Sequence, residues 1–100
     1  MQIAKVRGTV VSTHKEPSLK GVKFLLLQFV DEEGRLLQKY EVAADNVGAG
    51  LDEWVLVSLG GAARQVLGSE QRPIDAAVVA IIDTVSVENR SIYSKRDEYR

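Results

Sequence analysis

The sequence contains no cysteine and only one histidine. Without cysteine, the chain has neither a disulfide framework nor thiolate metal ligands. The single histidine, His14, lies in the polar stretch Ser12–Gly21. The sequence offers no second histidine to complete a metal site with His14. It also lacks a G-x-S-x-G motif that would indicate a serine nucleophile. We therefore expect a solvated loop histidine and no catalytic, metal or cofactor site.

The sequence also lacks an excess of one charge and any long apolar run. Thirteen basic and fourteen acidic residues give a net charge of −1, so no overall field attracts nucleic acid or an anionic membrane. The longest apolar run, Ala76–Ile82, is too short to span a bilayer. The first residues alternate in polarity and do not resemble a signal peptide. A single-domain, soluble, cytoplasmic protein of 100 residues is expected.

Period-two alternation between turn-forming residues predicts a mainly β protein. Five strands are expected, at residues 2–11, 22–30, 36–42, 53–59 and 76–86. Gly8 predicts a bulge within the first of them, and Gly34 predicts a hairpin turn after the second. One short helix is expected at residues 62–67, after the Gly60-Gly61 pair. This order favours a small five-stranded β-barrel of the oligonucleotide-binding type.

The last residues differ from the rest in composition. We expect a barrel domain over residues 1–87 and a strongly charged tail over residues 88–100. A short strand is expected near Ser91–Tyr93, followed by a mobile end.

The segment Val22–Val30 is apolar on both of its faces. Phe24 and Leu26 share one face, and the other carries Leu25, Leu27 and Phe29. A strand of this kind is usually buried on both sides. A small domain has little chain left to cover a second face, so a neighbouring subunit is the favoured cover and internal burial the alternative. The candidate apolar interface residues are Leu25, Leu27 and Phe29.

Two carboxylates, Asp75 and Asp83, bracket the longest apolar run. A glycosidase-like pair would need a pocket, and no loop insertion accompanies them. Asp75 is better explained as a turn or cap residue. Asp83 requires a partner near a buried strand, and Arg64 is a candidate.

A nucleic-acid-binding barrel is the alternative function. It would need basic residues interleaved with exposed aromatic ones. The strands carry only a modest set of cations: Lys5, Arg7, Lys23 and Lys39. The glycines at positions 48, 50, 60 and 61 lack the spacing of a Rossmann or P-loop phosphate site, which favours turn geometry or close backbone approach.

Three segments together resemble the EutN/CcmL family of bacterial microcompartment vertex proteins, including its carboxysome members. They are MQIAKVRGTVVST (1–13), DNVGAGLDEWVLVSLGGAAR (45–64) and RPIDAAVVAIIDTV (72–85). Gly61 departs from the pattern, because the family often has a serine there. The resemblance extends from residue 1 to about residue 87.

The resemblance implies a small barrel that assembles as a cyclic homopentamer and catalyses nothing. Such pentamers close the vertices of an icosahedral shell whose facets are hexameric carboxysome shell proteins. It places the chain in the carboxysome shell, within the cytoplasm, as part of photosynthetic carbon fixation and the carbon dioxide concentrating mechanism. Two motifs match the family as candidates for the subunit interface or the region near the axis: Gly60, Gly61, Ala62, Ala63 and Arg64, and Asp45, Asn46, Val47, Gly48, Ala49 and Gly50.

Overall fold

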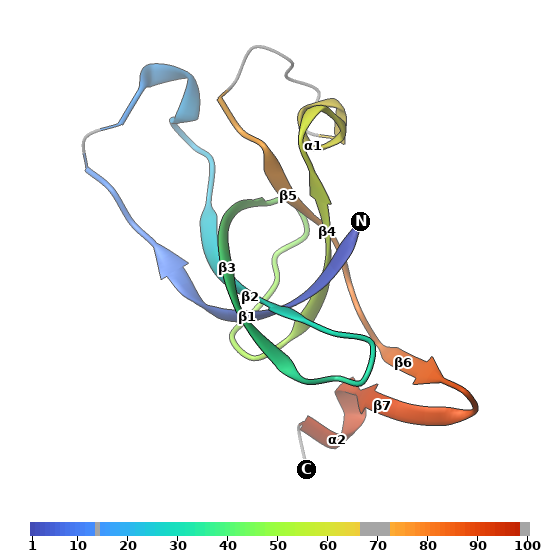
Figure 1. Cartoon of the computed structure of the whole chain (residues 1–100). Helices are drawn as coiled ribbons and strands as arrows, with labels where there is room; N and C mark the ends of the chain where they lie inside the picture. Colours follow the sequence, from blue (N-terminus) through green and yellow to red (C-terminus); the bar gives the residue numbers. More distant parts are fainter. Residues whose placement is uncertain (14, 67–72, 99–100) are drawn as a thin grey trace.

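Five strands close into a small barrel in the computed structural model, which describes residues 1–13, 15–66 and 73–98 (Figure 1). The order around the barrel is β1-β2-β3-β5-β4, and β1 pairs with both β2 and β4 to close it. All neighbours are antiparallel except β3 and β5, which run parallel. The strands are β1 (Gln2–Val10), β2 (Phe24–Val30), β3 (Leu36–Asp45), β4 (Trp54–Leu59) and β5 (Ala76–Ile81). The predicted five-stranded barrel is confirmed.

A bulge in β1 helps this strand to pair with two neighbours, β2 and β4. Its pairing with β2 skips a residue between Val6 and Gly8, where the sequence predicts a bulge. Bulges bend a strand and increase its twist, which a small closed barrel requires. The half before the bulge pairs with β4, and pairing with β2 continues through the bulge to Val10.

The barrel interior is filled by side chains that alternate along the strands. Large members include Val6 of β1, Leu27 and Phe29 of β2, and Val55 and Val57 of β4, all essentially inaccessible to solvent. Small residues such as Ala4, Ala43 and Ala76 complete the same cluster. A barrel of five strands is narrow, so these side chains fill its interior.

Short helices lie at the ends of the strands. A 3₁₀ turn, η1 (Pro17–Leu19), interrupts the loop between β1 and β2, and α1 (Gly61–Val66) follows β4 close to its predicted position. Among the described residues, no helix is long and apolar enough to cross a membrane.

The β2–β3 connection is a tight turn organised by Asp31. Its Oδ1 accepts hydrogen bonds from the backbone N–H groups of Glu33 and Arg35, at 2.8 and 2.9 Å. The bond from the Arg35 N–H, with smaller contributions from its neighbours, lowers the pKa of the Asp31 carboxyl. Gly34 adopts a positive φ of 84°, as predicted for this turn.

The predicted strand at residues 76–86 is two strands. β5 ends at Ile81, and after a bend the chain forms β6 (Thr84–Val87), which pairs with β7 (Arg90–Ser94) outside the barrel. The bend is fixed by the Ile82 N–H, which donates to the Trp54 carbonyl at 2.9 Å. Continuous apolar composition concealed this break, because both halves bury side chains, one in the barrel and one against its outer surface.

We call β6, β7 and the short α2 (Lys95–Glu98) the arm. The expected strand near Ser91–Tyr93 is confirmed as part of β7. The arm hairpin crosses the expected domain boundary between residues 87 and 88, and that boundary stays a prediction. The expected mobile end falls on residues 99–100, outside the described residues.

A second, smaller core attaches the arm to the barrel. The Tyr93 ring stacks on Trp54, with ring centroids 4.4 Å apart and an interplanar angle of 9°. The Trp54 N–H donates to the Tyr93 hydroxyl at 3.4 Å, while Val30 and Ile82 complete the cluster. Stacked aromatic pairs contribute beyond the area they bury, so this contact determines where the arm lies.

Replacing Tyr93 should therefore release the arm more than the barrel. Tyr93→Ala should lower the free energy of unfolding by about 3 kcal/mol, the usual cost of removing a buried aromatic ring. Tyr93→Phe keeps the stack and loses the hydroxyl that accepts from the Trp54 N–H, so its cost should stay at about 1 kcal/mol. Amide exchange should accelerate at residues 84–94 in the alanine variant alone. Equal exchange in both variants would show that the stack does not hold the arm.

Candidate subunit interface

An apolar surface covers the outside of β1, β2 and β3. The register places Val10 beside Phe24 and Leu26 beside Val42, and Tyr40 continues the same outer face along β3. Val10, Tyr40 and Val42 are exposed in the protomer, while Phe24 and Leu26 are half-buried. We call these five residues the groove face. Side chains of this kind are unusual on the outside of a solitary small barrel.

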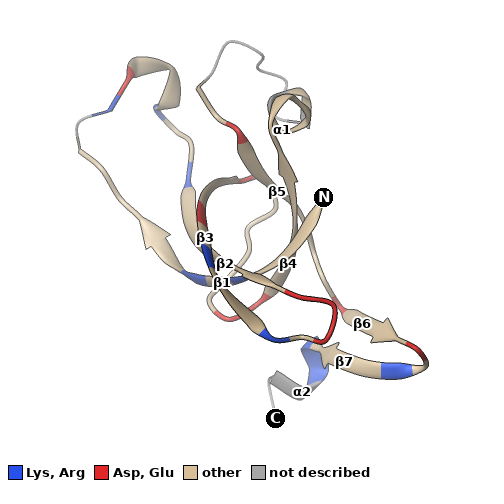
Figure 2. Ribbon diagram, in the orientation of Figure 1, with Lys and Arg blue, Asp and Glu red and all other residues tan. Residues whose placement is uncertain are grey.

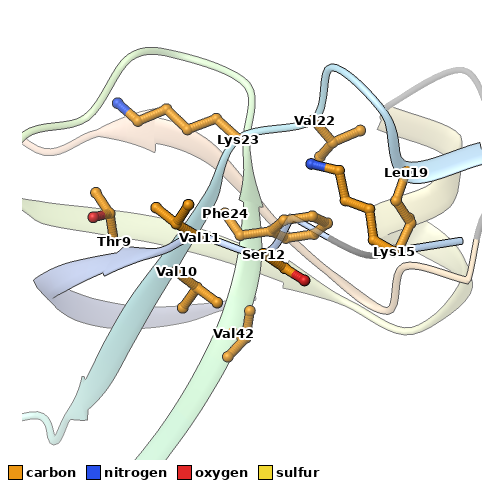
Figure 3. A pocket seen from close by; sticks show the side chains of 10 residues that line it. All are labelled: Thr9, Val10, Val11, Ser12, Lys15, Leu19, Val22, Lys23, Phe24 and Val42. Atoms are coloured by element: carbon orange, nitrogen blue, oxygen red, sulfur yellow. The ribbon is translucent and has the colours of Figure 1, made fainter. Parts of the chain in front are cut away.

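A groove opens at one end of this face. Its volume is about 550 Å³, and its lining includes Phe24 and Val42 together with Val11, Leu19 and Val22 of the β1–β2 connection (Figure 3). Lys15 and Lys23 also border it. The groove is therefore apolar inside; Lys15 adds a positive charge at its margin, and Lys23 is paired with Asp45.

A second apolar surface lies on the other side of β1. The register aligns Ile3 of β1 with Leu56 of β4, and Leu56 with Ala80 of β5. With Ile82 and Val85 these residues border a hollow of about 530 Å³ between the barrel and the start of the arm. We call Ile3, Leu56, Ala80, Ile82 and Val85 the hollow face. The exposed carboxylate of Asp83 lies in its lining.

The structure corrects the expectation that Leu25, Leu27 and Phe29 form an intersubunit contact. All three point into the barrel, and Leu27 is 0% exposed in the protomer. Because a barrel has one interior and side chains alternate, the opposite face of β2 must point outward. The residues available for contact on this strand are therefore Phe24 and Leu26.

Asp45 organises the loop between β3 and β4. Its side chain is only 2% exposed, and its Oδ1 accepts from the N–H groups of Val47 and Gly48 at 3.1 and 3.0 Å. Its Oδ2 lies 3.6 Å from Lys23 Nζ. Gly48 takes a positive φ of 77°. These bonds leave Asn46 and Val47 exposed on a defined turn.

Glu53 joins the end of this loop to the arm. Its Oε1 accepts from the Gly50 N–H at 2.6 Å, and its Oε2 lies 2.9 Å from Lys95 Nζ. The Lys95 N–H in turn donates to the Asp83 carbonyl at 2.8 Å. A Cβ at Gly50 would approach Glu53 Oε1 to 3.2 Å, so glycine leaves room for the carboxylate. Sequence reasoning missed Glu53 and Lys95, because residues so far apart give no pattern.

The motif that begins at Gly60 starts α1. Gly60 takes a positive φ of 65°, and its N–H donates to the Asp75 carbonyl at 2.6 Å. Gly61 and Ala62 are exposed, whereas Ala63 is fully buried. The Arg64 side chain, and with it the expected contact to Asp83, lies outside the described residues, as does His14.

The two glycine-containing motifs start near the same end of β5. Asp45 pairs with Val78 of this strand, and Gly60 bonds to Asp75 just before it. Tertiary structure therefore brings together two segments that the sequence separates by β4.

Comparison with known proteins agrees with this geometry. The family model described as "Ethanolamine utilisation protein EutN/carboxysome" matches residues 1–83. The chain belongs to the EutN/CcmL family. Over an alignment of 101 positions that covers 100% of both chains, it is 80% identical to the carboxysome shell vertex protein CcmL of Nostoc sp. (strain PCC 7120). It is 49% identical to the bacterial microcompartment shell vertex protein PduN of Salmonella typhimurium, over 86% of this chain and 99% of that one.

Solved structures of the EutN/CcmL family have the same fold. The structure of Gloeobacter violaceus CcmL superposes with a TM-score of 0.92 at 72% identity, covering 97% of this chain and 100% of that one. The GrpN pentameric microcompartment shell protein from Rhodospirillum rubrum superposes with a TM-score of 0.80 at 46% identity. The match covers 87% of this chain and 99% of that one. The resemblance inferred from three segments is thus confirmed.

Among the described residues, the lysines of the strands and their margins do not gather into a surface for nucleic acid. Lys5 Nζ lies 3.8 Å from Asp52, and Lys23 is paired with Asp45. Lys39 Nζ lies 4.8 Å from the centre of the Phe29 ring. Basic and acidic residues alternate along the described part of the ribbon and do not separate into large regions of one charge (Figure 2). Within the described residues, no three His, Cys, Asp or Glu side chains come together in a group able to hold a metal.

The two faces of β2 should respond differently to a charge. Leu27→Asp places a carboxylate in the core and should prevent folding, at a cost of about 5 kcal/mol or more. Leu26→Asp should keep the β-sheet circular dichroism spectrum but give a protomer of 11.0 kDa by light scattering. A Leu26→Asp protein that assembles like the unaltered chain would remove the outer face of β2 from any subunit contact.

The Glu53–Lys95 pair should matter more than a neighbouring surface pair. Lys95→Met leaves the largely buried Glu53 carboxylate without its cation and should cost about 1.5 kcal/mol. It should also speed amide exchange at Gly50 and in the arm together. The matched variant Lys5→Met breaks a longer, more exposed pair with Asp52 and should cost less than about 0.5 kcal/mol. Unchanged exchange at Gly50 in Lys95→Met would mean that the loop and the arm are independent.

Proposed function

We propose that this protein is a structural protein, not an enzyme, that closes the vertices of a carboxysome shell as a homopentamer. The observation that carries the proposal is the 80% identity over the whole chain to a carboxysome shell vertex protein. The fold agrees with the pentameric shell protein of R. rubrum, whose TM-score is 0.80. The protein would therefore be located in the carboxysome shell.

The surface of the protomer supports assembly. The groove face and the hollow face are separate apolar surfaces on one small barrel, and each has a hollow of more than 500 Å³. A cyclic ring repeats one contact between two different surfaces until it closes. A net charge of −1 per chain also keeps repulsion between five copies small.

The two glycine-containing motifs are proposed to line the contacts nearest the axis. They are Asp45–Gly50 and Gly60–Arg64. Their starts meet at one end of β5, and exposed Gly60, Gly61 and Ala62 allow backbones to approach closely where five copies crowd together. The hydrogen bonds to Asp45 keep the first motif in one conformation, which a repeated contact requires.

Hexameric carboxysome shell proteins are the proposed partners at the rim of the pentamer. A five-fold unit can close a shell only if other units fill the flat facets around it. The arm, which projects from the barrel, is a candidate for part of this rim (Figure 1).

The mass in solution tests the proposal directly. A homopentamer of this 11.0 kDa chain should elute at about 55 kDa on a sizing column with light scattering. The value should not fall when salt is raised, because the proposed contacts are mainly apolar. A stable mass of 11.0 kDa would contradict the vertex function. Salt-dependent binding to single-stranded nucleic acid would then be the next measurement.

A further inference from the structure

We propose that Val11 of one protomer inserts into the hollow face of the next protomer, and that this head-to-tail contact closes the ring. The inference rests on the proposed pentamer and adds which surfaces meet and in what orientation. Four features of the protomer carry it: an exposed apolar projection, a matching hollow, their placement around the barrel and the charges beside them.

Val11 is the projection. At 86% exposed it is the most accessible large hydrophobic side chain among the described residues. It directly follows β1, where the chain leaves the barrel and enters the β1–β2 connection that borders the groove. A β-branched side chain has little rotamer freedom to lose on burial. Covering this side chain favours association at each of the five contacts in a closed ring.

The hollow face is the receiving surface. Ile3, Leu56 and Ala80 form one row across three strands, each only partly covered by the protomer's own chain. The arm forms one side of the hollow through Val85. Ala80 has the smallest side chain of the row. A volume of about 530 Å³ is ample for a valine and its flanking backbone.

The two surfaces lie on different sides of the barrel. The β1–β2 connection, which borders the groove, lies on the side of β1 that pairs with β2. The hollow lies on the side of β1 that pairs with β4. In Figure 1 the β1–β2 connection extends to the left and the start of the arm lies to the right. A contact between two different surfaces is not two-fold symmetric, and it forms a ring when the rotation between neighbouring copies closes.

Charge at the margins selects the same pairing. Lys15 borders the groove and Asp83 borders the hollow, whereas Lys23 is already paired with Asp45 of its own protomer. Groove against hollow places Lys15 near Asp83, whereas groove against groove opposes two Lys15 side chains and hollow against hollow opposes two Asp83 carboxylates. Like charges in close contact penalise the symmetric alternatives.

Engineered cysteines test the contact without interference, because the chain has none of its own. The full-length double variant Val11→Cys/Ala80→Cys is treated with a short thiol-to-thiol cross-linker after its mass has been measured. The expected result is a ladder on a denaturing gel from 11.0 kDa to about five times that mass. Each single-cysteine variant should stay at 11.0 kDa, since a head-to-tail contact needs both thiols.

The matched control moves one thiol off the hollow. Val11→Cys/Arg90→Cys places the second cysteine at an exposed position of β7, and it should not form the ladder. If Ala80→Cys impairs folding, Thr84→Cys replaces it, because Thr84 is exposed in the lining of the hollow.

The outcomes separate this inference from the proposed function. A protein of about 55 kDa whose cysteine pair cross-links no better than the Arg90 control would overturn the Val11 contact and leave the pentamer standing. A cross-linked dimer of either single-cysteine variant would overturn it too, in favour of a symmetric contact, because one thiol per protomer can join only two copies. A wild-type protein of 11.0 kDa would contradict both the contact and the vertex function.

Discussion

A closed five-stranded barrel has one interior, and the rest of this structure depends on that constraint. Side chains alternate along each strand, so every apolar residue that does not point inward needs another cover. Leu27 and Phe29 of β2 fill the interior, which leaves Phe24 and Leu26 on the outside. The protomer covers part of its outer surface with the arm and leaves two apolar surfaces open. A structural role in an assembly is the natural use of such a molecule.

The arm shows how the chain covers part of its own exterior. Trp54 lies at the start of β4 and points out of the barrel, where the Tyr93 ring stacks on it. Lys95 adds a backbone bond to Asp83 and an ion pair to Glu53. The same Glu53 bonds to the Gly50 N–H, so the arm and the Asp45–Gly50 loop share one carboxylate. The hollow face exists because the arm leaves the barrel at an angle fixed by these contacts.

Much of this fold was predictable from the sequence. Alternation located the strands, the charged turn before Gly34 located the β2–β3 hairpin, and Gly8 marked the bulge. The continuous apolar composition of residues 76–86 concealed the bend at Ile82 and Asp83. The same kind of ambiguity misassigned β2: with both faces apolar, composition does not distinguish the inner set of side chains from the outer one.

The sequence by itself determined the strand positions, the turn residues and the EutN/CcmL family, because these follow from local pattern and from motifs that occur in order. Only the tertiary structure decided which face of β2 is interior and where the arm leaves the barrel. It alone brought Glu53 to Lys95 and placed Val11 and the hollow face on different sides of β1. The physical reason is that burial is a relation between segments distant in the chain, and closure of the barrel fixes it.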